Sequence, residues 1–183
     1  MKRHEKRFWR TVRRLLAEVD WLRTEQKALE RLIGVDTIGL DFFRVAYTAL
    51  HGDRLLRLVR VFEQSKRVAS FWYLYRCAPK EVGQGLDLCR LGEFSARLKT
   101  IRDKTLVHID KDAVFDPQAV YKEARITGNE IIWAVESAWE TLKRLHSEQP
   151  TGVTPYQFRD YTGDDIRELV KLRDRDRGRG GYR

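Results

Sequence analysis

Several residue types are scarce in this chain, and each scarcity excludes a class of protein. The 183 residues include only two cysteines, four prolines and one methionine, and no uninterrupted apolar run is longer than five residues. Such short runs cannot cross a bilayer, so we predict no membrane-spanning helix and no membrane partner. The two thiols, Cys77 and Cys89, are too few for a disulfide scaffold or a structural zinc site, and we expect both to be reduced.

Familiar signals of targeting and catalysis are also missing. The basic N-terminus is not followed by the apolar segment of a secretory signal, because Glu18 and Asp20 interrupt it. The chain contains no phosphate-binding loop, no nucleophile elbow, no zinc-protease motif and no complete dinucleotide-binding glycine motif. We therefore expect a cytoplasmic protein that uses neither a cofactor nor a metal.

The composition instead indicates a folded domain with an uneven distribution of charge. Hydrophobic residues make up 42% of the chain and charged residues 34%, and their 36 Lys and Arg against 27 Asp and Glu give a net charge of +9. Residues 1–14 carry seven Lys or Arg and one acid, and residues 173–183 carry five Arg and two Asp. The remaining residues have 24 of each sign, so the excess positive charge is confined to the two ends.

Basic ends of this kind are typical of contact with an anionic polymer or surface. We assign RNA contact to eight residues, most of them in these ends: Lys2, Arg3, Lys6, Arg7, Arg10, Lys104, Arg177 and Arg179. An anionic membrane surface is another possible contact for the N-terminal run. The structural alternative is a charged outer face of a long helix, together with a solvated tail.

The periodicity of apolar residues predicts an all-helical fold. In residues 1–34 the spacing alternates between three and four and defines one seam: Phe8, Val12, Leu15, Val19, Leu22, Gln26, Leu29 and Ile33. Further helices are expected over about 36–65, 68–76, 89–107, 116–147 and 163–172, with a kink or break at 51–53, a loop over 79–88 and a linker over 149–155.

These elements predict a bundle of four to five main helices with a long N-terminal helix, a short C-terminal helix and a mobile tail. We divide the chain into a helical bundle at 1–148, made of a basic helix at 1–34 and a core at 36–147, and a C-terminal segment at 149–183. The aromatic run at 71–75, Trp133 and Trp139 are expected in the core or at a dimer interface, with base stacking as the alternative. His4, His51 and His146 are expected at the surface without a partner.

One short segment combines residues that carry chemistry. Arg102 is followed at once by Asp103, and His108 comes after five intervening residues, at the expected end of the helix over 89–107. The pattern of Arg, a polar residue, several further residues and then His, late in a helical chain, resembles the HEPN-domain ribonucleases. The similarity is greatest to the AbiU2-like subgroup, which is associated with bacterial abortive infection, phage defence and toxin–antitoxin systems, and it covers about residues 36–147.

The resemblance implies a metal-independent endoribonuclease in which the substrate 2′-hydroxyl attacks the adjacent phosphate. It would assign the transition-state cation to Arg102, proton transfer to His108 and a supporting role to Asp103. On an ideal helix Arg102 and His108 lie about 9 Å and about 120° apart, which does not place both on one phosphate. The helix must therefore end irregularly, or two subunits must pair their motifs. HEPN proteins generally pair them, so the resemblance implies a homodimer. A cognate antitoxin protein is a further partner that the resemblance suggests.

Other interpretations of the same residues stay open. Arg102, Asp103 and His108 can form a polar cluster at a helix end, with Arg102 paired to Asp103 or Asp110. His108, Asp110, Asp112 and Asp116 can also be seen as metal ligands, although acids before a helix N-terminus are common without a metal. For the whole protein, the alternative to a ribonuclease is a non-catalytic helical module, such as an adaptor, an assembly subunit or an antitoxin.

Overall fold

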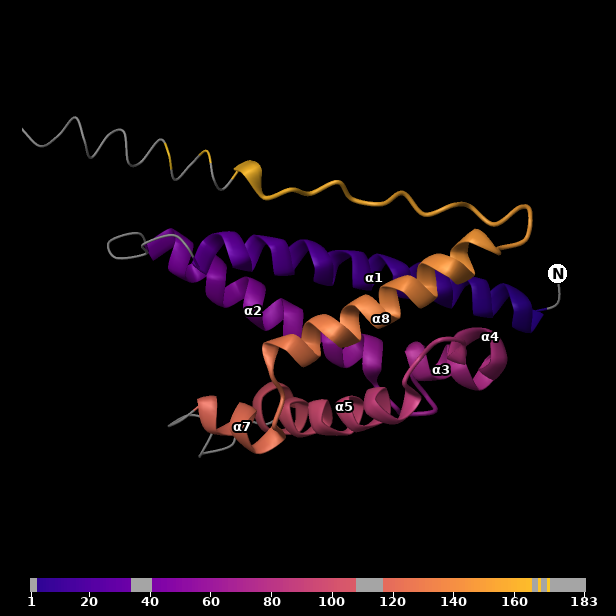
Figure 1. Ribbon diagram of the computed structural model, residues 1–183, viewed down its shortest axis with the longest axis horizontal. Coiled ribbons are helices and arrows are strands. Elements are labelled where there is room, and N and C mark those ends of the chain that lie inside the picture. Colours follow the sequence, from indigo (N-terminus) through magenta and orange to yellow (C-terminus); the bar gives the residue numbers. More distant parts are fainter. Residues whose placement is uncertain (1–2, 34–40, 108–116, 166–167, 169–170, 172–183) are drawn as a thin grey trace, which may run out of the picture.

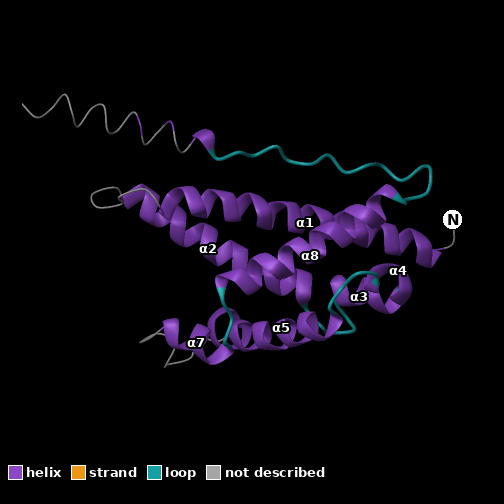
Figure 2. Cartoon of the chain, in the orientation of Figure 1, coloured by secondary structure: helices purple, strands orange, loops and turns teal. Residues whose placement is uncertain are grey.

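The computed structural model describes residues 3–33, 41–107, 117–165, 168 and 171. Within these residues the chain is helical and has no strand, as predicted (Figures 1 and 2). The elements are α1 (Arg3–Ile33), α2 (Asp41–Phe62), α3 (Phe71–Cys77), α4 (Pro79–Gly83), α5 (Leu88–Ile101), η1 (Arg102–Val107), α7 (Pro117–Ala124) and α8 (Gly128–Ser147). None of the described helices is long and apolar enough to cross a membrane.

The long helix α1 is built on the predicted seam. Val12, Leu15, Val19 and Leu22 are each at most 2% exposed, and they lie where α1 packs against α2 and α8. Burial of these four aliphatic side chains is the main favourable contribution to the free energy of folding of this helix, because its other faces are highly charged. The basic N-terminal residues thus belong to a helix of the bundle and do not form a separate extension.

Helix α2 is continuous from Asp41 to Phe62, so the break expected at 51–53 is absent. The expected C-terminal end was residue 65, but Glu63, Gln64 and Ser65 follow the helix as a loop. Gly52 fits within the helix because a single glycine weakens a helix without stopping it.

Two further boundaries differ from the prediction. Residues 79–88 were expected to form a loop, but Pro79 begins the short helix α4, a position where proline lacks only an N–H that would have no helical partner. The helix expected over 116–147 is divided into α7 and α8. Arg125 has a φ of 50°, and Thr127 and Glu130 form a reciprocal capping box that starts α8.

The helices form two layers. In Figure 1, α1, α2 and α8 lie on one side, and α3, α4, α5 and α7 lie on the other. The core lies between them, and a typical contact is the edge-on pair of Phe62 and Phe94, with ring centroids 5.4 Å apart. Phe71, Leu74 and Trp139 are buried, so the structure places these predicted aromatic-region residues in the core.

The segment after α8 does more than link two helices. It turns at 151–153 and returns as an extended chain along α1 (Figure 1). The Tyr156 hydroxyl donates to the buried carboxylate of Asp20 at 2.8 Å, and the backbone N–H of Tyr156 donates to Nε2 of His146 at 2.9 Å. His146 therefore has a partner, contrary to our expectation. Asp164, Asp165, Glu168 and Lys171 are helical, within the range predicted for the short C-terminal helix, and residues 172–183 lie outside the described residues.

Of the other two histidines expected at the surface, one is exposed and one is not. His4 is exposed, as expected. His51 was expected at the surface but is half-buried, and its ring lies 6.3 Å from that of Tyr47. Burial, with a contribution from the charge of Arg54, lowers the pKa of His51.

Candidate functional site

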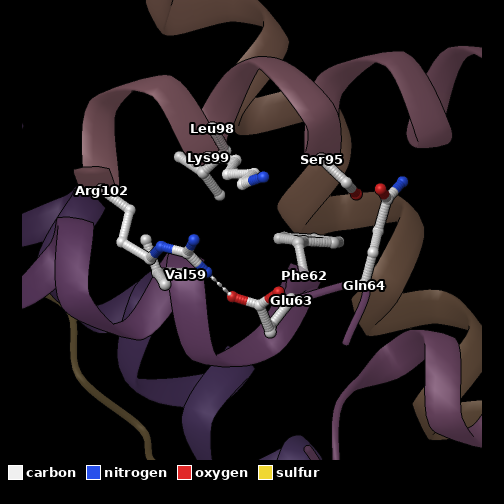
Figure 3. Close-up of a pocket in the computed structure, with 8 residues that line it drawn as sticks. All are labelled: Val59, Phe62, Glu63, Gln64, Ser95, Leu98, Lys99 and Arg102. Atoms are coloured by element: carbon white, nitrogen blue, oxygen red, sulfur yellow. Dashed lines mark hydrogen bonds and ion pairs between the residues drawn. The ribbon is translucent and has the colours of Figure 1, made fainter. Parts of the chain in front are cut away.

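Arg102 lies at the junction where α5 ends and η1 begins. Its Nε donates to Oδ1 of Asp103 at 2.8 Å, and Nη2 lies 2.7 Å from the same oxygen. Its Nη1 donates to Oε2 of Glu63, which follows α2 (Figure 3). Two carboxylates from different parts of the chain therefore fix the orientation of this guanidinium.

The contact of Asp103 with Arg102 is present, as expected both for a supporting role and for a polar cluster at a helix end. Glu63 is a second partner that no local pattern indicated. The hydrogen bond with Asp103 raises the pKa of Arg102, burial opposes this, and the charge of Glu63 raises the pKa further. Arg102 is consequently a permanent cation held in one place, which is a requirement for stabilising charge on a phosphate.

The guanidinium still has hydrogen-bonding capacity. An arginine side chain has five N–H donors, and the contacts with Asp103 and Glu63 use the Nε donor and one donor on each terminal nitrogen. In these contacts one donor on each terminal nitrogen remains, and the side chain is 24% exposed. Donors of this kind can contact phosphate oxygens.

A small pocket adjoins Arg102 (Figure 3). Its lining includes two cations, Arg102 and Lys99, one carboxylate, Glu63, and the apolar side chains of Val59 and Leu98. The cavity volume is about 30 Å³, which has room for water but not for a nucleotide. A substrate phosphate would therefore bind at the mouth of this pocket and not inside it.

The backbone after Arg102 is not an ordinary α-helix. Residues Arg102–Val107 form a π-helical segment, in which hydrogen bonds span five residues instead of four. The angular offset of about 120° between Arg102 and His108, calculated for an ideal α-helix, therefore does not apply here. We expected an irregular helix end near Val107 that turns His108 inward. The backbone is irregular over Arg102–Val107, and the position of His108 stays a prediction. His108 itself, with Asp110, Asp112 and Asp116, lies outside the described residues.

Lys104 occupies a different environment from the one we predicted for an RNA-binding residue. Its Nζ donates to both carboxylate oxygens of Glu123 in α7, at 2.8 and 2.6 Å. The pair is exposed, so Lys104 keeps access to solvent, but its charge is matched within the chain. Its position joins η1 to α7.

The basic residues of α1 fall into two groups. Lys6 and Arg10 line a second pocket, together with Trp9 and Arg13. Arg7 points elsewhere, with its guanidinium carbon 5.5 Å from the ring centroid of Tyr73 in α3. Other predicted RNA contacts, Lys2, Arg177 and Arg179, lie outside the described residues, as does the side chain of Arg3.

A partly buried cluster of three acids around one arginine lies between α1 and α2 and was not predicted from the sequence. Arg57 contacts Glu18 at 2.7 Å, Asp53 at 2.8 Å and Glu25 at 3.0 Å. The Glu25 side chain is 2% exposed, and burial, followed by the hydrogen bond with Asp53, raises its pKa to about 8, although Arg57 opposes the shift. The four-residue spacing of Asp53 and Arg57 was the only local signal of this cluster.

Among the described residues, no group of three or more His, Cys, Asp or Glu side chains is arranged to hold a metal ion. Cys77 and Cys89 are both free and exposed. We found no match to this chain among models of protein families, curated proteins or solved structures. The chemistry of its own residues therefore carries any functional conclusion.

Proposed function

We propose that this protein is a HEPN-type endoribonuclease of the AbiU2-like kind, in which Arg102 binds the scissile phosphate and His108 transfers the proton. The observation that carries the proposal is the state of Arg102. It is a permanent cation, oriented by Asp103 and Glu63, with two donors remaining and with Lys99 beside it. An abortive-infection or toxin–antitoxin role in bacteria, with a cognate antitoxin protein as partner, belongs to the same proposal.

The reaction needs no nucleophile from the protein. The 2′-hydroxyl of the RNA forms a bond to the adjacent phosphorus while the bond from phosphorus to the 5′-oxygen breaks. The products are a 2′,3′-cyclic phosphate and a 5′-hydroxyl, and the proton lost by the 2′-oxygen is balanced by one gained by the 5′-oxygen. Histidine suits both transfers near neutral pH, and Arg102 offsets the charge that develops on the phosphate oxygens.

A homodimer fits this chemistry. The proton is taken and given on opposite sides of the phosphorus, so two histidines serve better than one. A symmetric dimer would supply a second copy of Arg102 and His108 across a two-fold axis. Size-exclusion chromatography with light scattering measures this directly.

The decisive experiment compares Arg102→Ala and His108→Ala with Glu63→Gln on a labelled single-stranded RNA in the presence of EDTA. We expect both alanine variants to lose at least about a hundredfold in cleavage rate, which is typical for removal of one transition-state contact or one general acid–base group. Glu63→Gln removes the ion pair but keeps Arg102, so it should retain more activity than Arg102→Ala. Mass spectrometry should find the 2′,3′-cyclic phosphate.

Full cleavage by either alanine variant, or cleavage that EDTA abolishes, would contradict the proposal. Thermal unfolding of each variant provides the control for folding, because loss of activity in a destabilised protein has no mechanistic meaning.

One observation favours a second function, a non-catalytic helical module such as an adaptor or antitoxin. Two carboxylates surround the single guanidinium of Arg102, an arrangement that also serves to join α5 to the end of α2. In that case the purified wild-type protein cleaves no RNA, and Arg102→Ala lowers thermal stability as its main effect.

A further inference from the structure

A second pocket lies at the N-terminal part of α1, and we call it the α1 pocket. It is formed by Lys6, Trp9, Arg10 and Arg13 on one side and by the turn at 152–154 on the other, and its volume is about 250 Å³. This end of the molecule, where α1 begins and α8 ends, is opposite to α7 (Figure 1).

The helical spacing explains why these four side chains meet. Positions 6, 9, 10 and 13 are separated by three and four residues, so they share one face of α1. The buried seam of the helix, with Val12 and Leu16, lies on another face. The cations of the pocket are therefore presented to solvent by a helix that the core holds in place.

The charge of the α1 pocket is unbalanced. Lys6, Arg10 and Arg13 have no ion-pair partner among the described residues, and no acidic side chain lines the pocket. Elsewhere in the described chain, by contrast, Arg23 and Arg97 are each paired with a glutamate. Three adjacent cations repel one another, so an anionic ligand would relieve a cost that the free protein carries.

The other walls of the α1 pocket add specificity. Trp9 is half-buried, packs against the hydrophobic core and makes an edge-on contact with Phe8, with ring centroids 5.2 Å apart. Opposite, Gly152 has a φ of 93°, which only glycine adopts readily, and the N–H of Val153 closes the turn on Pro150. Thr154 contributes a hydroxyl that can donate to an anion.

We propose that the α1 pocket binds one nucleotide unit of single-stranded RNA, with a phosphate on Arg10, Arg13 and Lys6 and a base stacked on Trp9. This inference rests on the proposed function in taking RNA as the ligand. Cations beside an aromatic ring are the combination that single-strand binding requires. A membrane fits less well, because the apolar face that α1 would insert into lipid is buried in the core.

The volume also limits the ligand. A pocket of about 250 Å³ lies just below the range of roughly 300–1,000 Å³ for complete small-molecule sites. It suits one unit of a longer strand better than a whole dinucleotide cofactor. Because the α1 pocket lies where α1 begins and Arg102 lies where α5 ends, the pocket would hold one unit of the RNA while Arg102 acts on another.

The test uses the full chain and a fluorescein-labelled 2′-O-methyl RNA of about 12 nucleotides, which binds but lacks the attacking hydroxyl. Fluorescence anisotropy gives its Kd at several salt concentrations. We expect Arg10→Glu combined with Arg13→Glu to raise the Kd at least about tenfold and to reduce the salt slope by about 0.7, the contribution of one phosphate contact on a single strand. Trp9→Leu keeps an apolar side chain but removes stacking, and it should raise the Kd about tenfold.

The matched control reverses two exposed arginines outside the pocket, Arg14→Glu with Arg67→Glu, and has the same change in net charge. It should change the Kd far less than the pocket variant. Equal effects of the two charge reversals, no effect of Trp9→Leu, or no binding by the wild-type protein would overturn the proposal. Binding to phosphatidylserine vesicles that the pocket variant loses while keeping RNA affinity would assign the pocket to membranes and overturn it as well.

The outcome is separable from that of the ribonuclease proposal. If pocket variants lose affinity while Arg102→Ala has no effect on any cleavage, the α1 pocket stands and the catalytic assignment fails. If Arg102→Ala abolishes cleavage while pocket variants bind RNA normally, the catalytic assignment stands and the α1 pocket fails.

Discussion

Arg57 and Arg102 each contact several carboxylates, but the consequences for the single residues differ. Arg102 has two such neighbours, both at least partly exposed, and its role there is to be held in position. Arg57 has three, and one of them, Glu25, is almost completely buried. Burial disfavours the charged form of Glu25, and the hydrogen bond with Asp53 adds to this effect. The raised pKa therefore leaves a proton on Glu25 near neutral pH, although Arg57 opposes the shift.

This retained proton makes stability depend on pH. The pKa of Glu25 is raised from 4.5 to about 8 in the folded chain, so between these values the folded state binds more protons than the unfolded state. The free energy of unfolding therefore falls as pH rises through this window, by at most about 1.4 kcal/mol per pH unit for one proton. Glu25→Gln keeps the shape of the side chain but does not titrate, so its thermal midpoint should fall less than that of the wild type between about pH 5 and pH 8.

The control for this prediction is Glu140→Gln, which changes an exposed glutamate of α8. Its thermal midpoints should run parallel to those of the wild type across the same pH range. If the Glu25→Gln curve is also parallel, the buried acid is ionised in the folded protein and the prediction fails.

At the scale of whole elements, the sequence predicted the helices whose position is set by the burial of regularly spaced apolar residues. The seam of Val12, Leu15, Val19 and Leu22 identified α1 because these residues drive its burial. The same reasoning joined α7 to α8, since Val120, Ala124 and Ile131 keep helical spacing across the break. Arg125, with a φ of 50°, follows the end of α7, and the capping box of Thr127 and Glu130 starts α8. The capping box was a recognisable signal that the periodicity obscured.

The candidate site required information that no local pattern contains. Asp103 could be predicted as a partner of Arg102 because it is the next residue. Glu63 is 39 residues away in the sequence, and only the packing of α2 against α5 and η1 brings it to Arg102. The π-helical geometry of η1 likewise has no sequence signature among the common helix signals. The Arg57 cluster, which joins α1 to α2, was missed for the same reason.

The capping box leads to a prediction for α8. Thr127 Oγ1 accepts from the N–H of Glu130 at 3.3 Å, and the Glu130 carboxylate accepts from the N–H of Thr127 at 3.0 Å. Removal of an N-cap hydroxyl costs about 1 kcal/mol. Thr127→Ala should therefore lower the thermal midpoint by about 2–4 °C, as measured by circular dichroism.

Thr127→Ser is the matched variant, because it keeps the hydroxyl that accepts the hydrogen bond and loses only a methyl group. We expect its midpoint to lie close to that of the wild type. Equal midpoints for the serine and alanine variants would mean that the capping box does not stabilise α8.

For the whole molecule, the position of the positive charge matters more than its total. The sequence located the excess charge at the two ends of the chain, and residues 3–14 begin α1, as predicted, and include the buried side chain of Val12. Deleting residues 1–14 would therefore damage the core and could not test RNA binding alone. The extended chain at 149–163 returns along α1 and contributes the turn of the α1 pocket, so the N-terminal helix and the C-terminal segment form one surface.

The tail at 173–183 can be tested separately, because it contributes five Arg and two Asp to the net charge of +9. If the tail gathers RNA by charge alone, deleting it removes a formal charge of +3 and should raise the KM for RNA and reduce its salt dependence by up to about two units of slope. The kcat should be unchanged, since charge-driven capture precedes the chemical step.

A tail in which the five arginines are replaced by glutamine and the two aspartates by asparagine keeps the length and lowers the formal charge of the tail from +3 to zero, as the deletion does. If the charge of the tail captures RNA, this variant should have the same raised KM as the deletion. If the length of the tail is what matters, its KM should be that of the wild-type protein. A deletion that lowers kcat would instead place the tail in the catalytic cycle. A deletion that changes neither KM nor its salt dependence would leave the α1 pocket, whose three cations have no ion-pair partner among the described residues, as the main source of RNA affinity outside the motif at Arg102.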